Sequence, residues 1–67
     1  MSKFQIAEML RAYNAARASR AAYRAGHLKA SRILIMDAAV SFGLAKRPVE
    51  ARKAMAIYNL LLARHVA

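Results

Sequence analysis

The chain has 67 residues, with twelve Lys or Arg against three Asp or Glu, a formal net charge of +9 and no cysteine. A chain of this length forms a single domain, residues 1–67, and buries only about 60% of the surface that its unfolded form exposes. The lack of cysteine excludes disulfides and thiolate metal sites, so helix packing or oligomerisation must supply any additional stability.

Gly26 and Pro48 divide the chain into three segments that each have helical character. The predicted helices cover residues 2–25, 27 or 28 to 45, and 47 or 48 to 66, with Ser2 as N-cap, Gly26 as C-cap and Pro48 in a first turn. No stretch alternates with a period of two, so no strand is expected. Because the connections are short, we expect an all-α, up-down-up three-helix bundle, or a helical hairpin whose third helix is exchanged in a dimer.

The first predicted helix changes character along one face. That face begins with apolar side chains and continues with basic ones: Ile6, Met9, Leu10, Tyr13, Arg17, Arg20 and Arg24. The opposite side is a smooth row of small residues: Ala15, Ala18, Ala22 and Ala25. We expect the alanine side to pack against a neighbouring helix and the arginine side to stay exposed.

The second predicted helix is apolar on nearly every side. One side carries Ile33, Met36, Val40 and Leu44, and the other carries Leu34, Ile35, Ala38, Phe42 and Ala45. A helix of this kind must be covered on both sides, either as the centre of the bundle or within a subunit interface. The pattern therefore favours a homodimer.

The third predicted helix has the clearest periodicity in the chain. Its apolar residues recur at helical spacing: Ala51, Ala54, Met55, Tyr58, Leu61 and Leu62. We expect this stripe to form part of the core.

Two interpretations of the arginine face stay open. Arg17, Arg20 and Arg24 are either a solvated face with extended side chains, or a docking strip with Tyr13 at its end. Such a strip would bind phosphates and a stacked base, or the carboxylates of a partner protein. The second interpretation gains weight because only Glu8, Asp37 and Glu50 are present to neutralise these charges.

Around the second connection, Ala39, Gly43, Leu44 and Val49 follow the spacing Ala-x-x-x-Gly-hydrophobic-x-x-x-x-Val. This quarter of the chain resembles the helix-turn-helix of DNA-binding proteins, in which the glycine lets the chain turn. The resemblance would place Ala45, Lys46, Arg47 and Glu50 toward a DNA groove. It departs from the pattern at Arg52, where a buried aliphatic residue is expected, and the alternative is a plain turn between two helices.

Catalytic chemistry has little support in the sequence. There is no glycine-rich phosphate loop, no close carboxylate pair and no nucleophile spaced from a base, so we expect no enzyme and no cofactor. His27 and His65 would lie at the same end of an up-down-up bundle, but they lack a third metal ligand and we expect no metal site. The longest strongly apolar run, residues 33–36, is far below the roughly 18 residues of a membrane span, and a cytoplasmic location is expected.

The sequence thus predicts a non-enzymatic, basic binding module. The first hypothesis is nucleic-acid binding. The alternative is a small adaptor or inhibitor, of the kind that phages or mobile elements encode, that docks on an acidic protein surface. A third hypothesis, an N-terminal helix on a membrane surface, has a short apolar half. The candidate binding residues are Tyr13, Arg17, Arg20, Arg24, Lys46, Arg47, Arg52 and Lys53.

Overall fold

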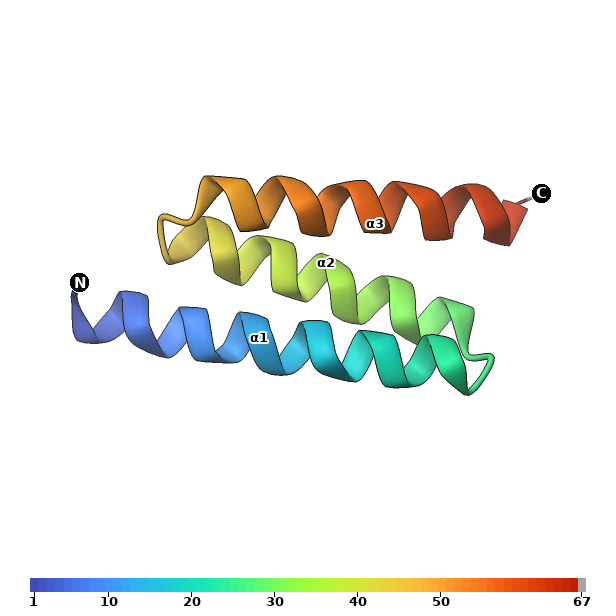
Figure 1. The fold of residues 1–67 in the computed structure, drawn as a ribbon, viewed down its shortest axis with the longest axis horizontal. Helices are drawn as coiled ribbons and strands as arrows, with labels where there is room; N and C mark the ends of the chain where they lie inside the picture. The colour runs from blue at the N-terminus through green and yellow to red at the C-terminus, as the bar shows by residue number, and fades with distance from the viewer. Residues whose placement is uncertain (67) are drawn as a thin grey trace.

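The computed structural model describes residues 1–66, with side chains described for residues 1–64. It contains three α-helices: α1 (Lys3–Arg24), α2 (Leu28–Leu44) and α3 (Pro48–Val66). The helices run up, down and up, with α2 between the other two (Figure 1). No strand occurs in the described residues, so the predicted all-α, three-helix fold is confirmed, and α3 packs on α2 of its own chain.

The first helix begins at the predicted N-cap and ends one residue before the predicted C-cap, with Ala25 in that position instead of Gly26. The Ser2 hydroxyl accepts a hydrogen bond from the Gln5 backbone N–H, and the Gln5 side chain accepts one from the Ser2 N–H, which is a capping box. At the other end Gly26 has a φ of +83° and follows the C-cap Ala25. The His27 N–H then donates to the Ala22 carbonyl, so glycine, the residue that adopts this backbone most easily, reverses the chain.

The second turn has the same hydrogen-bond pattern without a glycine. Lys46 takes the left-handed position with a φ of 61°, and the Arg47 N–H donates to the Phe42 carbonyl. Gly43 is an ordinary helical residue inside α2. Of the two interpretations of this connection, the structure favours the plain turn between two helices, because α2 continues past Gly43 to Leu44 and α2 and α3 lie side by side (Figure 1).

Small residues and one reciprocal pair of serines form part of the contact between α1 and α2. Ser19 Oγ donates to the Ser31 carbonyl at 2.7 Å, and Ser31 Oγ donates to the Ser19 carbonyl at 2.8 Å. Ala12 is fully buried on the same face of α1. The predicted alanine face is correct only in part: Ala18 and Ala25 are exposed, because the packed face is rotated toward Ala12 and Ser19.

The core is thin. Among the described side chains, eight hydrophobic residues are buried and five of them are alanines, which leaves Ile35, Phe42 and Leu61 as the large ones. The predicted stripe of α3 does face the core through Ala54 and Leu61, but Leu62 at its edge is exposed. A core with so few large side chains gives little hydrophobic stabilisation, which scales with the apolar area buried.

The three helices form an open V rather than a closed triangle. α2 packs against both α1 and α3, whereas α1 and α3 have little direct contact. The two sides of the V therefore differ. The inner side lies between α1 and α3, and the outer side exposes Ile33, Val40 and Leu44 of α2, each about half exposed. These three residues lie on one face of α2, which we call the outer face, and it points away from the buried Ile35.

Candidate functional site

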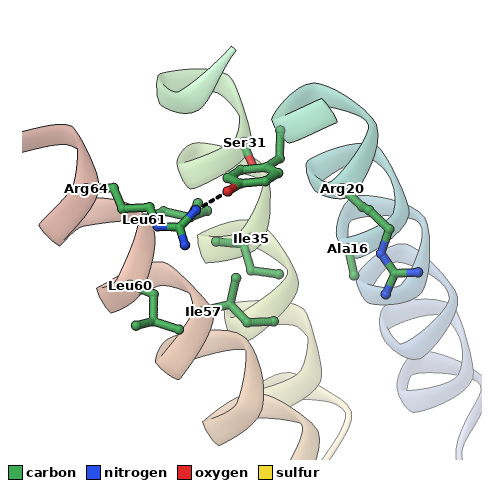
Figure 2. Close-up of a pocket in the computed structure, with 9 residues that line it drawn as sticks. Ala16, Arg20, Ser31, Ile35, Ile57, Leu60, Leu61 and Arg64 are labelled. Atoms are coloured by element: carbon green, nitrogen blue, oxygen red, sulfur yellow. Dashed lines mark hydrogen bonds between the residues drawn. The ribbon is translucent and has the colours of Figure 1, made fainter. Parts of the chain in front are cut away.

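An apolar groove lies on the inner side of the V, in a cavity of about 300 Å³ that is open to solvent. Ile35 of α2 forms its floor, Ile57, Leu60 and Leu61 of α3 form one wall, and Ala16 of α1 lies opposite (Figure 2). Leu60 is 66% exposed although it lines an apolar cavity. Such an arrangement is typical of a binding site for apolar groups. We call it the inner groove.

One end of the inner groove is bridged by two side chains. Arg64 of α3 donates a hydrogen bond to the Tyr23 hydroxyl of α1, and its guanidinium carbon lies 5.8 Å from the centroid of the Tyr23 ring. Both residues line the cavity, and Figure 2 shows Arg64 at its place on α3. This pair links the two outer helices at the end where the chain passes from α1 to α2.

The predicted arginine strip lies beside this groove. Arg20 lines the cavity from α1, and Arg17 and Arg24 are exposed on the same side of the helix, further from the groove. The prediction that this face stays exposed is confirmed. Together with Arg64, the strip places cations along both edges of an apolar hollow.

Tyr13 lies on the same side of α1, but its ring is engaged. It contacts Phe42 edge to face, with the ring centroids 5.0 Å apart and the planes at 87°. Such contacts stabilise aromatic pairs. The ring therefore supports the packing of α1 on α2, which leaves its face less available for stacking on a base.

The remaining predicted binding residues lie around the second turn. Lys46 and Arg52 line a separate shallow hollow there, together with Arg47, and Lys53 is exposed on α3. This turn lies at the opposite end of the molecule from the turn between α1 and α2 (Figure 1). The eight predicted residues thus form two groups rather than one continuous surface.

Arg47 is the one member of the second group with an acidic partner. Its Nε and Nη2 donate to the two carboxylate oxygens of Glu50 at 3.1 and 3.2 Å. These hydrogen bonds lower the pKa of Glu50 and raise the pKa of Arg47. Arg47 is therefore partly neutralised and is a weaker candidate for binding an external anion.

Few of the other cations are neutralised within the chain. Besides the Arg47 pair, Arg11 is the only cation of the described residues that lies near a carboxylate, at 3.5 Å from Glu8 Oε1. The remaining ten of the twelve Lys and Arg residues have no carboxylate within 4.0 Å in the described part of the chain. Glu8 is itself buried, and its Oε2 has no hydrogen-bond partner.

Of the residues that line the groove, only Arg20 is among the binding residues predicted from the sequence. Ile57, Leu60 and Arg64 recur at i, i+3 and i+7, on a face adjacent to the core stripe of α3. That spacing is present in the sequence, but the core stripe through Leu61 is the stronger pattern on the same helix. The up-down-up order also implies that Arg64 ends beside the arginines of α1.

Other kinds of site have little support in the described residues. No three His, Cys, Asp or Glu side chains gather there as a metal site would require. The side chain of His65, one of the two histidines considered above, lies outside the described side chains. None of the three helices has an apolar stretch that could cross a membrane.

No known protein family, curated protein or solved structure matches this chain.

Proposed function

We propose that the protein is a non-enzymatic docking module that binds an acidic partner protein through the inner groove. The observation that carries this proposal is the combination of an apolar groove with cations at both edges, Arg20 on α1 and Arg64 on α3. Exposed apolar side chains that gather in a hollow are typical of protein interaction sites. Arginine is suited to their rim, because its planar group makes forked contacts with carboxylates.

Nucleic-acid binding is the second candidate function. Its support is the large number of cations without a carboxylate partner, including Arg17, Arg20 and Arg24. Phosphates would pair with these cations. The groove beside the cations, however, is lined by Ile57 and Leu60, which donate no hydrogen bonds to a phosphate. A protein partner accounts for the apolar and the basic features together.

We further propose that the working form is a homodimer assembled through the outer face of α2. Residues 27–45 carry two basic residues and one Asp, the lowest net charge of the three segments. Two copies can therefore meet at Ile33, Val40 and Leu44 with little repulsion. The inner grooves would then face outward, where a partner can reach them.

The proposal predicts that protein capture depends on where charge is removed and not only on how much. One triple variant replaces Arg17, Arg20 and Arg24 by Gln, and a matched variant replaces Lys29, Lys46 and Arg52 by Gln. Both lose three charges. A captured protein should survive nuclease treatment, be lost with the first variant and be retained with the second.

Two outcomes contradict the proposal. Capture that disappears with nuclease would favour the nucleic-acid candidate. Equal loss in both variants would mean that the net charge, rather than the groove, holds the partner. For nucleic acid, each lost phosphate contact should also flatten the slope of log K against log salt by about 0.7–0.9.

A further inference from the structure

Resting on the proposed function, we infer that the inner groove takes a single amphipathic helix with an acidic flank, which completes the open V as a fourth helix. The reason is that the V is open between α1 and α3. α1 and α3 each pack on α2 but hardly on each other, so the groove between them has the shape into which another helix packs. Grooves of this kind commonly hold a helix by apolar residues spaced at i, i+3 or i+4, and i+7.

The size of the cavity indicates how much of that helix is anchored. A cavity of about 300 Å³ is twice the roughly 150 Å³ of an apolar cavity that holds benzene. It therefore accommodates two large apolar side chains. Ile35 would lie below these anchors, and Ile57 and Leu60 beside them.

The arginines beside the groove determine which side chains the bound helix carries on the side that faces them. Arg17, Arg20 and Arg24 extend over seven residues, which is about 10 Å of helix. A helix lying along α1 with carboxylates at i, i+3 or i+4, and i+7 would face all three. Arg64 already bonds the Tyr23 hydroxyl, so it can meet a carboxylate at the other edge by exchanging that partner.

A second copy of this chain cannot be the occupant, because it lacks the required carboxylates. Glu8 is buried and Glu50 is paired with Arg47. Asp37 stands alone on α2, between Ile33 and Val40 of the outer face. No helix of the chain therefore presents a row of acidic residues, and two grooves brought together would set arginine against arginine.

The test uses designed peptides of about 18 residues, roughly 27 Å of helix. The first has leucines at i, i+4 and i+7 flanked by glutamates; the second has the same composition in an order that removes the apolar face. Fluorescence anisotropy should show that the intact protein binds the first peptide about tenfold or more tightly than the second, as expected when buried apolar anchors dominate affinity. Circular dichroism should show a gain of helix on binding.

Matched protein variants locate the site. Leu60→Asn should weaken binding of the first peptide by about tenfold, whereas Leu62→Asn, on another face of α3, should leave it within about twofold. Both residues are exposed, so neither change should unfold the chain, and thermal melts of the two variants check this.

The outcomes separate this inference from the proposed function. If both peptides bind equally well and both lose binding when Arg17, Arg20 and Arg24 become Gln, the inference of a fourth helix is overturned. The proposal of an acidic partner would still hold, because the arginines would still be needed for binding. The last comparison uses a 20-nucleotide single strand, which is about one to five times the usual length of a single-strand binding site. If this strand binds and neither peptide does, both the proposed function and the fourth helix are contradicted. Equal effects of Leu60→Asn and Leu62→Asn also overturn the inference.

Discussion

At the scale of single residues, stability rests on a few large side chains. Leu61 is 6% exposed and lies between the core and the inner groove. Its neighbour Leu62 is 36% exposed. Substitution of each leucine by alanine changes helix propensity by the same amount. The difference between the two substitutions in the free energy of unfolding therefore reports the contribution of the core.

We expect Leu61→Ala to lower the free energy of unfolding by about 2–5 kcal/mol, as for other buried leucines. Leu62→Ala should cost less, because Leu62 is 36% exposed in the folded chain and so has less apolar surface to lose from the packed interior. Thermal melts followed by circular dichroism measure both. Equal small shifts would mean that Leu61 does not belong to the core.

The pairing of Glu50 with Arg47 predicts a pH dependence of stability. The hydrogen bonds from Arg47 lower the pKa of Glu50 in the folded chain, so the folded state binds fewer protons than the unfolded state. The stabilisation is thus complete above the unfolded pKa of about 4.3, and it is lost as the pH falls through the lower, folded value.

In melts at decreasing pH, the wild type should therefore lose stability more steeply below about pH 4 than Glu50→Gln, which has no proton to gain. Repulsion among the other charges affects both proteins alike. Parallel curves would show that the pair does not contribute to stability.

At the scale of the helices, the two turns have one geometry and different residues. Gly26 and Lys46 both adopt left-handed backbone, with φ values of +83° and 61°. A Cβ added at Gly26 or at the helical Gly43 would meet no atom within 4 Å. Any difference between Ala substitutions at these glycines therefore reports backbone conformation and not crowding.

We expect Gly26→Ala to destabilise the chain by about 1 kcal/mol, because a side chain strains left-handed backbone. In a domain of this size that corresponds to a fall in Tm of roughly 4–8 °C. Gly43→Ala should raise stability by about 0.5–1 kcal/mol, as alanine does within a helix. Melting temperatures that move in the same direction would contradict the two assigned conformations.

The sequence predicted the helices well, because their signals are local. Ser2, Gly26 and Pro48 determine ends that fall within a residue or two of the observed ones. The rotation of α1 was harder to predict, since alanines occur on several of its faces. The reciprocal bonds of Ser19 and Ser31 select the packed face, and neither serine suggests such a pairing by itself.

The candidate site was predicted only in part, because sequence patterns report on single helices and not on how the helices pack together. The arginines of α1 form a pattern within one helix, whereas the groove requires Arg20, Ile35 and Leu60 from three helices. How these helices open into a V depends on the packing between them. Periodicity within each helix carries no information about that angle.

At the scale of the whole molecule, large apolar side chains remain exposed on both sides of the V. The outer face of α2 accounts for Ile33, Val40 and Leu44, and the inner groove for Ile57 and Leu60. A thin alanine core and a small size make these surfaces important for stability. We therefore expect association to stabilise the chain.

Sedimentation should give a dimer mass for the wild type at micromolar concentration, with a Tm that rises with protein concentration. Val40→Glu, which adds a second carboxylate beside Asp37 on the outer face, should give a folded monomer or a protein of much lower Tm. Leu60→Glu, on the inner groove, should leave the dimer intact. A wild-type monomer with a Tm independent of concentration would contradict the proposed dimer.

In the proposed function, the inner groove is the surface that binds an acidic partner. The most direct test is a titration of the isotope-labelled chain with the acidic amphipathic peptide, followed by amide chemical-shift changes in NMR spectra. We expect the largest changes at Ala16, Arg20, Ile57 and Leu60, with little change at Ile33 and Val40. Changes that concentrate at Lys46 and Arg52, or that spread evenly over all the basic residues, would contradict it.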